Sequence, residues 1–257
     1  MRTTSDQDRV TYVGHATVLL ELDGVRFLTD PVLRSRLLHL RRQVGAHDED
    51  AAARLDAVLI SHLHHDHVDV PSLRGLGRET PLLAPPGAEN FLRRRGFHAV
   101  TELAPGESHA IGGVEITAVE AEHRGGRALR SVGSEAIGFV LAGSRRAYFA
   151  GDTDLFDGMA DLGAGDLDLA LLPVWGWGPT LGPGHLDPER AAKAAALLSP
   201  RIAVPIHWGT LFPVGLSRIG RRHLIAPPRE FERRCGELAP QVDVRVLDPG
   251  ETTSLAA

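Results

Sequence analysis

The segment from His62 to His67 is crowded with metal-ligating side chains: His62, His64, His65, Asp66 and His67. The whole chain holds 13 histidines in 257 residues, so this crowding indicates metal binding rather than a surface loop. His62 and His64 are two residues apart in a segment that leaves a predicted strand. Side chains at such positions point the same way and can reach one cation. Asp66 and His67 follow closely and can turn towards a second cation beside it.

Three more ligand-type side chains come just after predicted strands: His123, Asp152 and His207. Each one alone has an ordinary explanation, as a capping aspartate or a hydrogen-bonded histidine. Because all three repeat the placement of the first cluster, we expect the four segments to meet at one metal centre. Nitrogen and carboxylate ligands in this mixture favour Zn²⁺, with Mn²⁺ or Fe²⁺ as alternatives.

Short strands that would position these side chains dominate the first half of the chain. Apolar and β-branched runs predict strands at 10–13, 17–21 and 25–29, and Asp23-Gly24 predicts a tight hairpin between the last two. The stretch 32–50, rich in Arg and His, is predicted to be irregular, with at most one helical turn. The continuous apolar run 55–60 predicts a strand buried on both faces, directly before the histidine cluster.

Helices and strands alternate in the remainder of the chain. Helical segments are predicted at 71–76, 88–95, 188–198 and 228–238, and strands at 82–84, 114–119, 136–141, 147–150, 167–172, 202–205 and 242–246. The helix at 188–198 has the strongest signals, because Asp187 suits the N-cap and Pro188 the first turn. This order of elements predicts an α/β protein of layered sheets flanked by helices, in one domain over residues 1–257.

The composition is that of an ordinary globular protein, with 43% apolar and 24% charged residues. A net charge of −5 gives no support to nucleic-acid binding, which usually shows a basic excess. No secretory signal or membrane-spanning apolar run is visible, and Cys235, the single cysteine, fits a reducing compartment. We therefore expect a soluble, cytoplasmic protein without stable membrane association, and leave open a homo-oligomer.

Six short segments of the sequence resemble one branch of the metallo-β-lactamase superfamily. They are Tyr12–Thr17, Leu28–Pro31, Asp56–His62, Phe149–Thr153, His185–Glu189 and Ile206–Thr210. With the histidine cluster, they are similar to the branch that holds the N-acyl-phosphatidylethanolamine phospholipase D enzymes, the ascorbate-6-phosphate lactonases and many bacterial hydrolases. The resemblance extends over residues 10–250.

The resemblance implies an αββα sandwich that carries two divalent metal ions at one edge of its sheets. One metal would be held by three histidines: His62, His64 and His123. The other would be held by Asp66, His67 and His207, with Asp152 as the bridge between the two metals. His185 matches a histidine that lies in the active site of the phospholipase and is not a metal ligand.

Two such cations lower the pKa of a shared water, so that a hydroxide can attack phosphorus or carbonyl carbon at neutral pH. The charges of two Zn²⁺ ions outweigh those of two aspartates and a hydroxide, so an anionic small-molecule substrate is expected. Asp66, as a ligand, and His185, as a proton donor or transition-state contact, are the expected catalytic residues. The alternative for His185 is a solvent-exposed position ahead of a helix.

Residues around the ligands suggest further roles. His15 and Asp30 are candidates to orient the ligand histidines, with turn formation as the alternative. Arg124 and Arg127 could bind a phosphate group, although solvated charge is the commoner role of arginines in loops. Trp175 and Trp177 could wall the substrate pocket or serve ordinary packing.

The leading hypothesis is a metal-dependent hydrolase that uses a metal-bridging hydroxide on a phosphodiester or related anionic ester, with a lactonase as the alternative. A long-chain phospholipid substrate fits less well, because no amphipathic membrane-binding helix is evident. A second class is a non-catalytic metal-binding or ligand-binding protein on the same fold. Degenerate members should lose ligands, whereas all seven positions are filled here. A di-iron redox enzyme, which usually carries a flavin-binding domain, is a third class.

Overall fold

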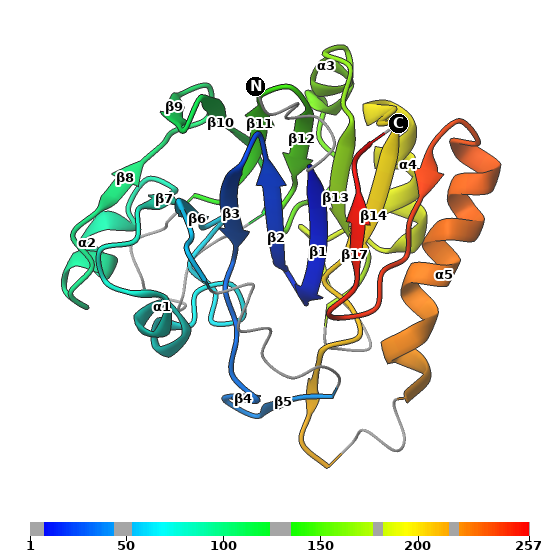
Figure 1. Ribbon diagram of the computed structural model, residues 1–257. Coiled ribbons are helices and arrows are strands. Elements are labelled where there is room, and N and C mark those ends of the chain that lie inside the picture. The colour runs from blue at the N-terminus through cyan, green and yellow to red at the C-terminus, as the bar shows by residue number, and fades with distance from the viewer. Residues whose placement is uncertain (1–7, 44–52, 124–134, 177–181, 216–220, 257) are drawn as a thin grey trace.

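Two seven-stranded sheets face each other at the centre of the fold, with helices packed around them (Figure 1). The computed structural model describes residues 8–43, 53–123, 135–176, 182–215 and 221–256. The first sheet has the strand order β17-β1-β2-β3-β6-β7-β8. Its strands are Arg9–Gly14 (β1), Thr17–Leu22 (β2), Val25–Thr29 (β3), Ala57–Leu59 (β6), Leu82–Ala84 (β7), Val100–Glu102 (β8) and Thr252–Ser254 (β17).

The second sheet has the strand order β16-β14-β13-β12-β11-β10-β9. Its strands are Ser108–Ile111 (β9), Val114–Glu120 (β10), Ile137–Ala142 (β11), Arg146–Phe149 (β12), Leu169–Pro173 (β13), Ile202–Ile206 (β14) and Asp243–Val244 (β16). The strands β12, β13 and β14 are parallel, whereas β9 to β12 pair antiparallel. The predicted layered α/β architecture, an αββα sandwich, is confirmed. The sequence patterns missed β8, β9 and β17, which are short.

The described helices are Val70–Leu76 (α1), Glu89–Arg93 (α2), Met159–Gly163 (α3), Pro188–Leu198 (α4) and Arg221–Leu238 (α5). Helix α4 has the predicted bounds, because the Asp187 side chain accepts a hydrogen bond from the backbone N–H of Arg190 at 2.8 Å and Pro188 occupies the first turn. Helix α3 was not predicted. Among the described helices, none is long and apolar enough to cross a membrane.

Strand β6 separates two hydrophobic cores. Ala57 and Leu59 belong to the core between the sheets, whereas Val58 and Ile60 pack with apolar residues of α1 and α2. Successive side chains of a strand point to opposite faces, so a strand that is apolar at every position needs cover on both sides. The predicted burial of this strand on both faces is confirmed.

Helix α5 begins at Arg221, well before the predicted start at Pro228. Proline suits the first turn of a helix, and this preference led to the wrong boundary. Instead, Pro227 and Pro228 lie inside the helix. The helix continues through them because Leu224, Phe231 and Cys235, which share one face, are all buried.

The stretch after β3, predicted to be irregular with at most one helical turn, contains a small hairpin. Strands β4 (Arg36–Leu37) and β5 (Leu40–Arg42) pair antiparallel, and β15 (Leu211–Pro213) adds a third strand to them. In Figure 1 these strands lie apart from the two large sheets. The pairing partner comes from far along the chain, so local sequence patterns did not reveal it.

Candidate metal centre

The predicted ligands come just after strands that run in the same direction. His15, Asp30 and the His62–His67 cluster follow β1, β3 and β6, which are mutually parallel in the first sheet. Strands β10, β12 and β14 likewise share one direction in the second sheet, and they lead into the other three ligands, His123, Asp152 and His207. Ligands in α/β folds bind at the carboxyl ends of strands. The sandwich therefore gathers ligand-type side chains from both sheets.

His62, His64 and His123 form the first group of converging nitrogen atoms. Nε2 of His62 lies 2.9 Å from Nδ1 of His64, and Nε2 of His123 lies 3.3 Å from the same Nδ1. The three ligand atoms lie within 4.8 Å of one another. The His62 side chain is fully buried, whereas those of His64 and His123 are partly exposed to solvent.

Asp66, His67 and His207 form the second group. Nε2 of His67 lies 3.1 Å from Nε2 of His207, and Oδ2 of Asp66 lies 4.0 Å and 3.9 Å from these two nitrogen atoms. The two Nε2 atoms of His67 and His207 face the same space, so their ring protons must sit on the opposite nitrogen atoms if both are to act as ligands.

Asp152 lies between the two groups. Its Oδ2 is 3.2 Å from Nε2 of His67 and 4.0 Å from Nε2 of His62, and its Oδ1 is 3.3 Å from Nε2 of His207. The structure thus brings all seven predicted ligands together, with the predicted bridging carboxylate in the middle.

The outward-facing ring nitrogens of four ligands have hydrogen-bond partners. Nδ1 of His67 lies 2.7 Å from Oδ2 of Asp30, and Nδ1 of His123 lies 2.8 Å from the carbonyl oxygen of Gly184. The remaining partners are the carbonyl oxygen of Trp175 for His207 and Oγ of Ser61 for His62. An acceptor on Nδ1 keeps the proton there and turns the Nε2 lone pair inward.

Asp30 and His15 contact two of the candidate ligands, His67 and Asp66. Asp30 is fully buried and accepts hydrogen bonds from the backbone N–H and the hydroxyl of Ser61 as well as facing His67. Nε2 of His15 lies 3.1 Å from Oδ2 of Asp66, and its ring packs on that of His207 at 3.8 Å between centroids. The contacts of Ser61 with Asp30 and His62 were not predicted from the sequence. The position of Ser61 between strand β6 and the histidine cluster could have indicated them.

The loops that carry these side chains have unusual backbone conformations. His15, Asp30 and His207 all have positive φ angles, of 58°, 33° and 64°. Gly151, directly before Asp152, has φ +61°, and a Cβ atom there would lie 2.5 Å from Cβ of Ser61. Such conformations are costly for residues other than glycine and tend to occur at functional sites.

Burial and the two carboxylates set the protonation of the cluster. Burial lowers the pKa of His62 well below its usual range and that of His207 to about 3. Burial also opposes the charged form of His67, but Asp152 and Asp30 outweigh it and raise the pKa of His67. For Asp152, burial is outweighed by His207 and His67, so its pKa is lowered. His62 and His207 therefore favour the neutral form and Asp152 the ionised form, which are the forms that bind metals. His67, by contrast, favours its protonated form and would have to release that proton to bind a cation.

The distances between donor atoms fit divalent metal ions. A tetrahedral site with metal–nitrogen bonds of about 2.0–2.1 Å separates its ligand atoms by about 3.3 Å. The pairs His62–His64, His64–His123 and His67–His207 are separated by 2.9, 3.3 and 3.1 Å. In addition, the buried Oδ1 of Asp152 accepts no hydrogen bond from the described residues. A buried carboxylate oxygen among inward-facing nitrogen lone pairs is best satisfied by a cation.

His185 lies at the open side of the centre. Its Nε2 is 3.6 Å from Oδ2 of Asp152, and its ring meets that of His123 edge-on at 4.7 Å. Trp175 is 7% exposed, stacks on Phe212 and lines a pocket of about 500 Å³ next to His185. The other proposed substrate contacts, Arg124, Arg127 and Trp177, lie outside the described residues.

The sequence is similar to known metal-dependent hydrolases. The model of the β-lactamase superfamily domain matches residues 25–208. A metal-dependent hydrolase of Methanopyrus kandleri is 32% identical, with 95% of this chain and 98% of that protein covered. An N-acyl-phosphatidylethanolamine-hydrolyzing phospholipase D of Caenorhabditis elegans is also 32% identical, over 80% of this chain and 64% of that protein.

The chain is also similar to part of a longer protein and to a solved structure. An uncharacterized protein of Mycobacterium tuberculosis is 34% identical over 78% of this chain, and the chain spans 58% of the length of that relative. Among solved structures, Igni18, a metallo hydrolase of Ignicoccus hospitalis, aligns with a TM-score of 0.72 and 26% identity over 96% of this chain and 97% of that one. The chain belongs to the metallo-β-lactamase superfamily, and it is similar over almost its whole length to proteins described as metal-dependent hydrolases.

Proposed function

We propose that this chain is a binuclear hydrolase that cleaves a phosphodiester or a related anionic ester. The observation that carries the proposal is the position of Asp152, with one carboxylate oxygen 3.2 Å from His67 and 4.0 Å from His62. A carboxylate that reaches both groups of donor atoms is the arrangement expected of a paired metal site. The chain is 32% identical to a phospholipase D that is named for hydrolysing N-acyl-phosphatidylethanolamine, which is a phosphodiester. This similarity supports a phosphodiester as the substrate class.

Zn²⁺ is the proposed metal at both positions, with Mn²⁺ and Fe²⁺ as alternatives. Imidazole nitrogens supply five of the seven candidate ligands, and aspartate supplies the other two: His62, His64, Asp66, His67, His123, Asp152 and His207. Borderline nitrogen ligands with few carboxylates favour Zn²⁺ over Mg²⁺ or Ca²⁺. When bound, such ions lower the pKa of water and polarise phosphoryl or carbonyl oxygens.

His185 is the proposed proton donor to the leaving group. Its Nε2 faces Asp152 at 3.6 Å, and its Nδ1 is buried without a hydrogen-bond partner among the described residues. In hydrolysis, the oxygen of water bonds to the phosphorus or carbonyl carbon while the bond to the leaving oxygen breaks, and that oxygen needs a proton. A histidine at the open side of the centre can supply this proton.

Metal loading combined with substrate screening tests the proposed function. Protein stripped by a chelator is reloaded with Zn²⁺, Mn²⁺ or Fe²⁺, and bound metal is counted by elemental analysis. We expect two ions per chain, hydrolysis of a chromogenic phosphodiester by the loaded protein, and loss of this activity on chelation. Hydrolysis confined to a panel of lactones would replace the phosphodiesterase proposal by the lactonase alternative. Full metal occupancy with no hydrolysis of any ester or lactone would overturn the proposal.

Replacing His185 with alanine should lower kcat by about 10²–10⁴-fold for an ester with a poor leaving group. The loss should be much smaller for a 4-nitrophenyl ester, because nitrophenolate leaves without a proton. Measuring kcat for phenyl and 4-nitrophenyl esters of the same acid checks this. Metal content should equal that of the wild type. A variant that loses metal, or loses equal activity on both esters, would argue against proton donation.

A further inference from the structure

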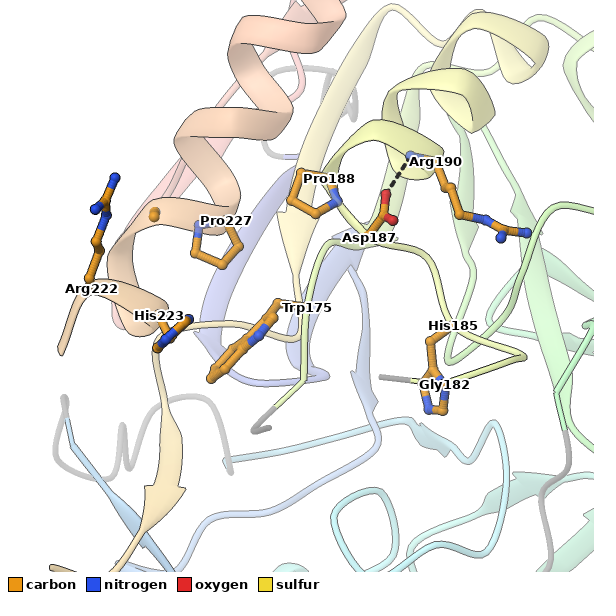
Figure 2. Close-up of a pocket in the computed structure, with 10 residues that line it drawn as sticks. Trp175, Gly182, His185, Asp187, Pro188, Arg190, Arg222, His223 and Pro227 are labelled. Carbon is orange, nitrogen blue, oxygen red and sulfur yellow. Dashed lines mark hydrogen bonds between the residues drawn. The ribbon is translucent and has the colours of Figure 1, made fainter. Parts of the chain in front are cut away.

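A pocket of about 500 Å³ opens beside the candidate metal centre. It lies between the segment after β13, the start of α4 and the first turns of α5 (Figure 2). Its size falls within the range of about 300–1,000 Å³ that is common for small-molecule sites. His185 lines the pocket and also lies 3.6 Å from Asp152, so the pocket and the metal centre share a wall.

The middle of the pocket is apolar. Trp175 forms one side, and Pro188 and Pro227 lie near its indole ring (Figure 2). Trp175 is held in place by stacking on Phe212 at 6.3 Å between centroids. Its carbonyl oxygen also accepts the Nδ1 hydrogen bond of the ligand His207. The apolar surface that extends from His185 is suited to a short hydrocarbon segment.

Two of the charged groups that line the pocket are already paired within the fold. The Asp187 carboxylate caps α4 by accepting the backbone N–H of Arg190 at 2.8 Å. The Arg190 guanidinium forms an ion pair with Asp154, and its side chain extends away from Trp175 in Figure 2. These two residues therefore help to shape the pocket.

Arg222 and His223 differ from these, because neither side chain has an ion-pair or hydrogen-bond partner among the described residues. Both are exposed in the first turn of α5. The His223 ring lies beside Trp175 (Figure 2). Arg222 lies further out on the same helix, and its exposed side chain points away from Trp175, so its guanidinium reaches the pocket by a change of rotamer. An arginine without an acid partner at the far side of a pocket is well suited to bind a carboxylate or phosphate.

We propose that Arg222, with His223 beside it, binds a second anionic group of the substrate, while the ester to be cleaved lies at the metal centre. This inference rests on the proposed function for the position of the ester. It assigns the substrate to a narrower class, that of small molecules with a carboxylate or phosphate separated from the ester by a short apolar segment. The pocket selects such molecules because one end meets the metal centre and the other meets a cation.

Binding of simple carboxylates to the zinc-loaded protein tests the proposal without requiring turnover. The probes are linear α,ω-dicarboxylates of increasing chain length, each compared with the monocarboxylate of equal length by calorimetry. A first carboxylate can bind at the metal centre in both series. At the chain lengths that span the pocket, wild-type protein should bind the dicarboxylate about tenfold more tightly, the value of one charge-assisted hydrogen bond.

Substitutions in α5 test which residue causes the preference for dicarboxylates. Arg222→Ala should remove the dicarboxylate preference and leave monocarboxylate affinity unchanged, and Arg222→Lys should retain part of the preference through its charge. The matched control is Arg229→Ala, because Arg229 is an exposed arginine of the same helix outside the pocket lining. This control should bind both series like the wild type.

The outcomes separate the inference from the proposed function. Equal binding of both series by the wild type at every length would overturn the inference, as would equal effects of Arg222→Ala and Arg229→Ala. If the preference depends on Arg222 but the loaded protein hydrolyses no ester or lactone, the anion site stands and the proposed function fails. If esters are hydrolysed without the preference, the proposed function stands and the anion site fails.

Discussion

Replacing Asp152 with alanine should lower kcat by about 10³-fold or more, since the contribution of a metal pair to transition-state stabilisation amounts to several kcal/mol. Asp152 is the carboxylate nearest to both donor groups, with contacts of 3.2 Å to His67, 3.3 Å to His207 and 4.0 Å to His62. Without it, the second group keeps only Asp66 and two histidines. We therefore expect the variant to bind fewer than two ions per chain.

Elemental analysis and kcat on the chromogenic phosphodiester check this prediction together. The matched control is Asp168→Ala, which removes a carboxylate that accepts hydrogen bonds from Arg145 and from the backbone of Arg146 near the start of β12. The control loses a structural contact at the opposite end of the strand and should keep both metals. An Asp152→Ala protein that retains two ions and activity within a factor of about ten would contradict the bridging role.

Replacing Asp30 with asparagine should weaken metal binding at one of the two proposed sites by about 10–100-fold, the usual effect of removing a group that orients a ligand. Oδ2 of Asp30 lies 2.7 Å from Nδ1 of His67 and also accepts the hydroxyl of Ser61. An amide nitrogen in that place would face the Nδ1 proton of His67 donor to donor. Relief of this clash moves the ring proton to Nε2, the atom that faces His207 and Asp152.

Competition with a chromogenic zinc chelator measures both affinities of the Asp30→Asn protein. The loss should fall on the site built from Asp66, His67 and His207, while the site built from His62, His64 and His123 changes less. The control is Asp168→Asn, another isosteric change at a hydrogen-bonded carboxylate. If both zinc affinities equal those of the wild type, Asp30 has only a structural role.

The parts of the fold that were predicted from sequence are those whose stability comes from nearby residues. The hairpin at Asp23-Gly24 has φ angles of 52° and 81°, which is the left-handed turn that this dipeptide favours. Helix α4 is bounded as its own capping residues predict. The predicted start of α5 was wrong, because the helix is extended by the burial of Leu224 against distant segments. The β4–β5 hairpin was not predicted, because it depends on pairing with β15, far along the chain.

The ligand positions were accessible from sequence for a similar reason. The His62–His67 cluster is local, and His123, Asp152 and His207 each lie a few residues beyond a predicted strand. Strand direction then brings them to one edge, so residue type and placement suffice to name them. The acceptors behind the ligands are different, since carbonyl oxygens of Trp175 and Gly184 carry no residue-specific signal.

The sequence by itself thus determined which ligand-type side chains the proposed centre contains, because metal ligation depends on side-chain type and spacing along a few short segments. The tertiary structure decided the rest. It placed Asp152 between the two groups, put a hydrogen-bond partner behind the outer nitrogen of each supported histidine, and brought Arg222 of α5 into the lining of the same pocket as His185. These features depend on distances between residues far apart in the chain, and packing of the two sheets and α5 sets those distances.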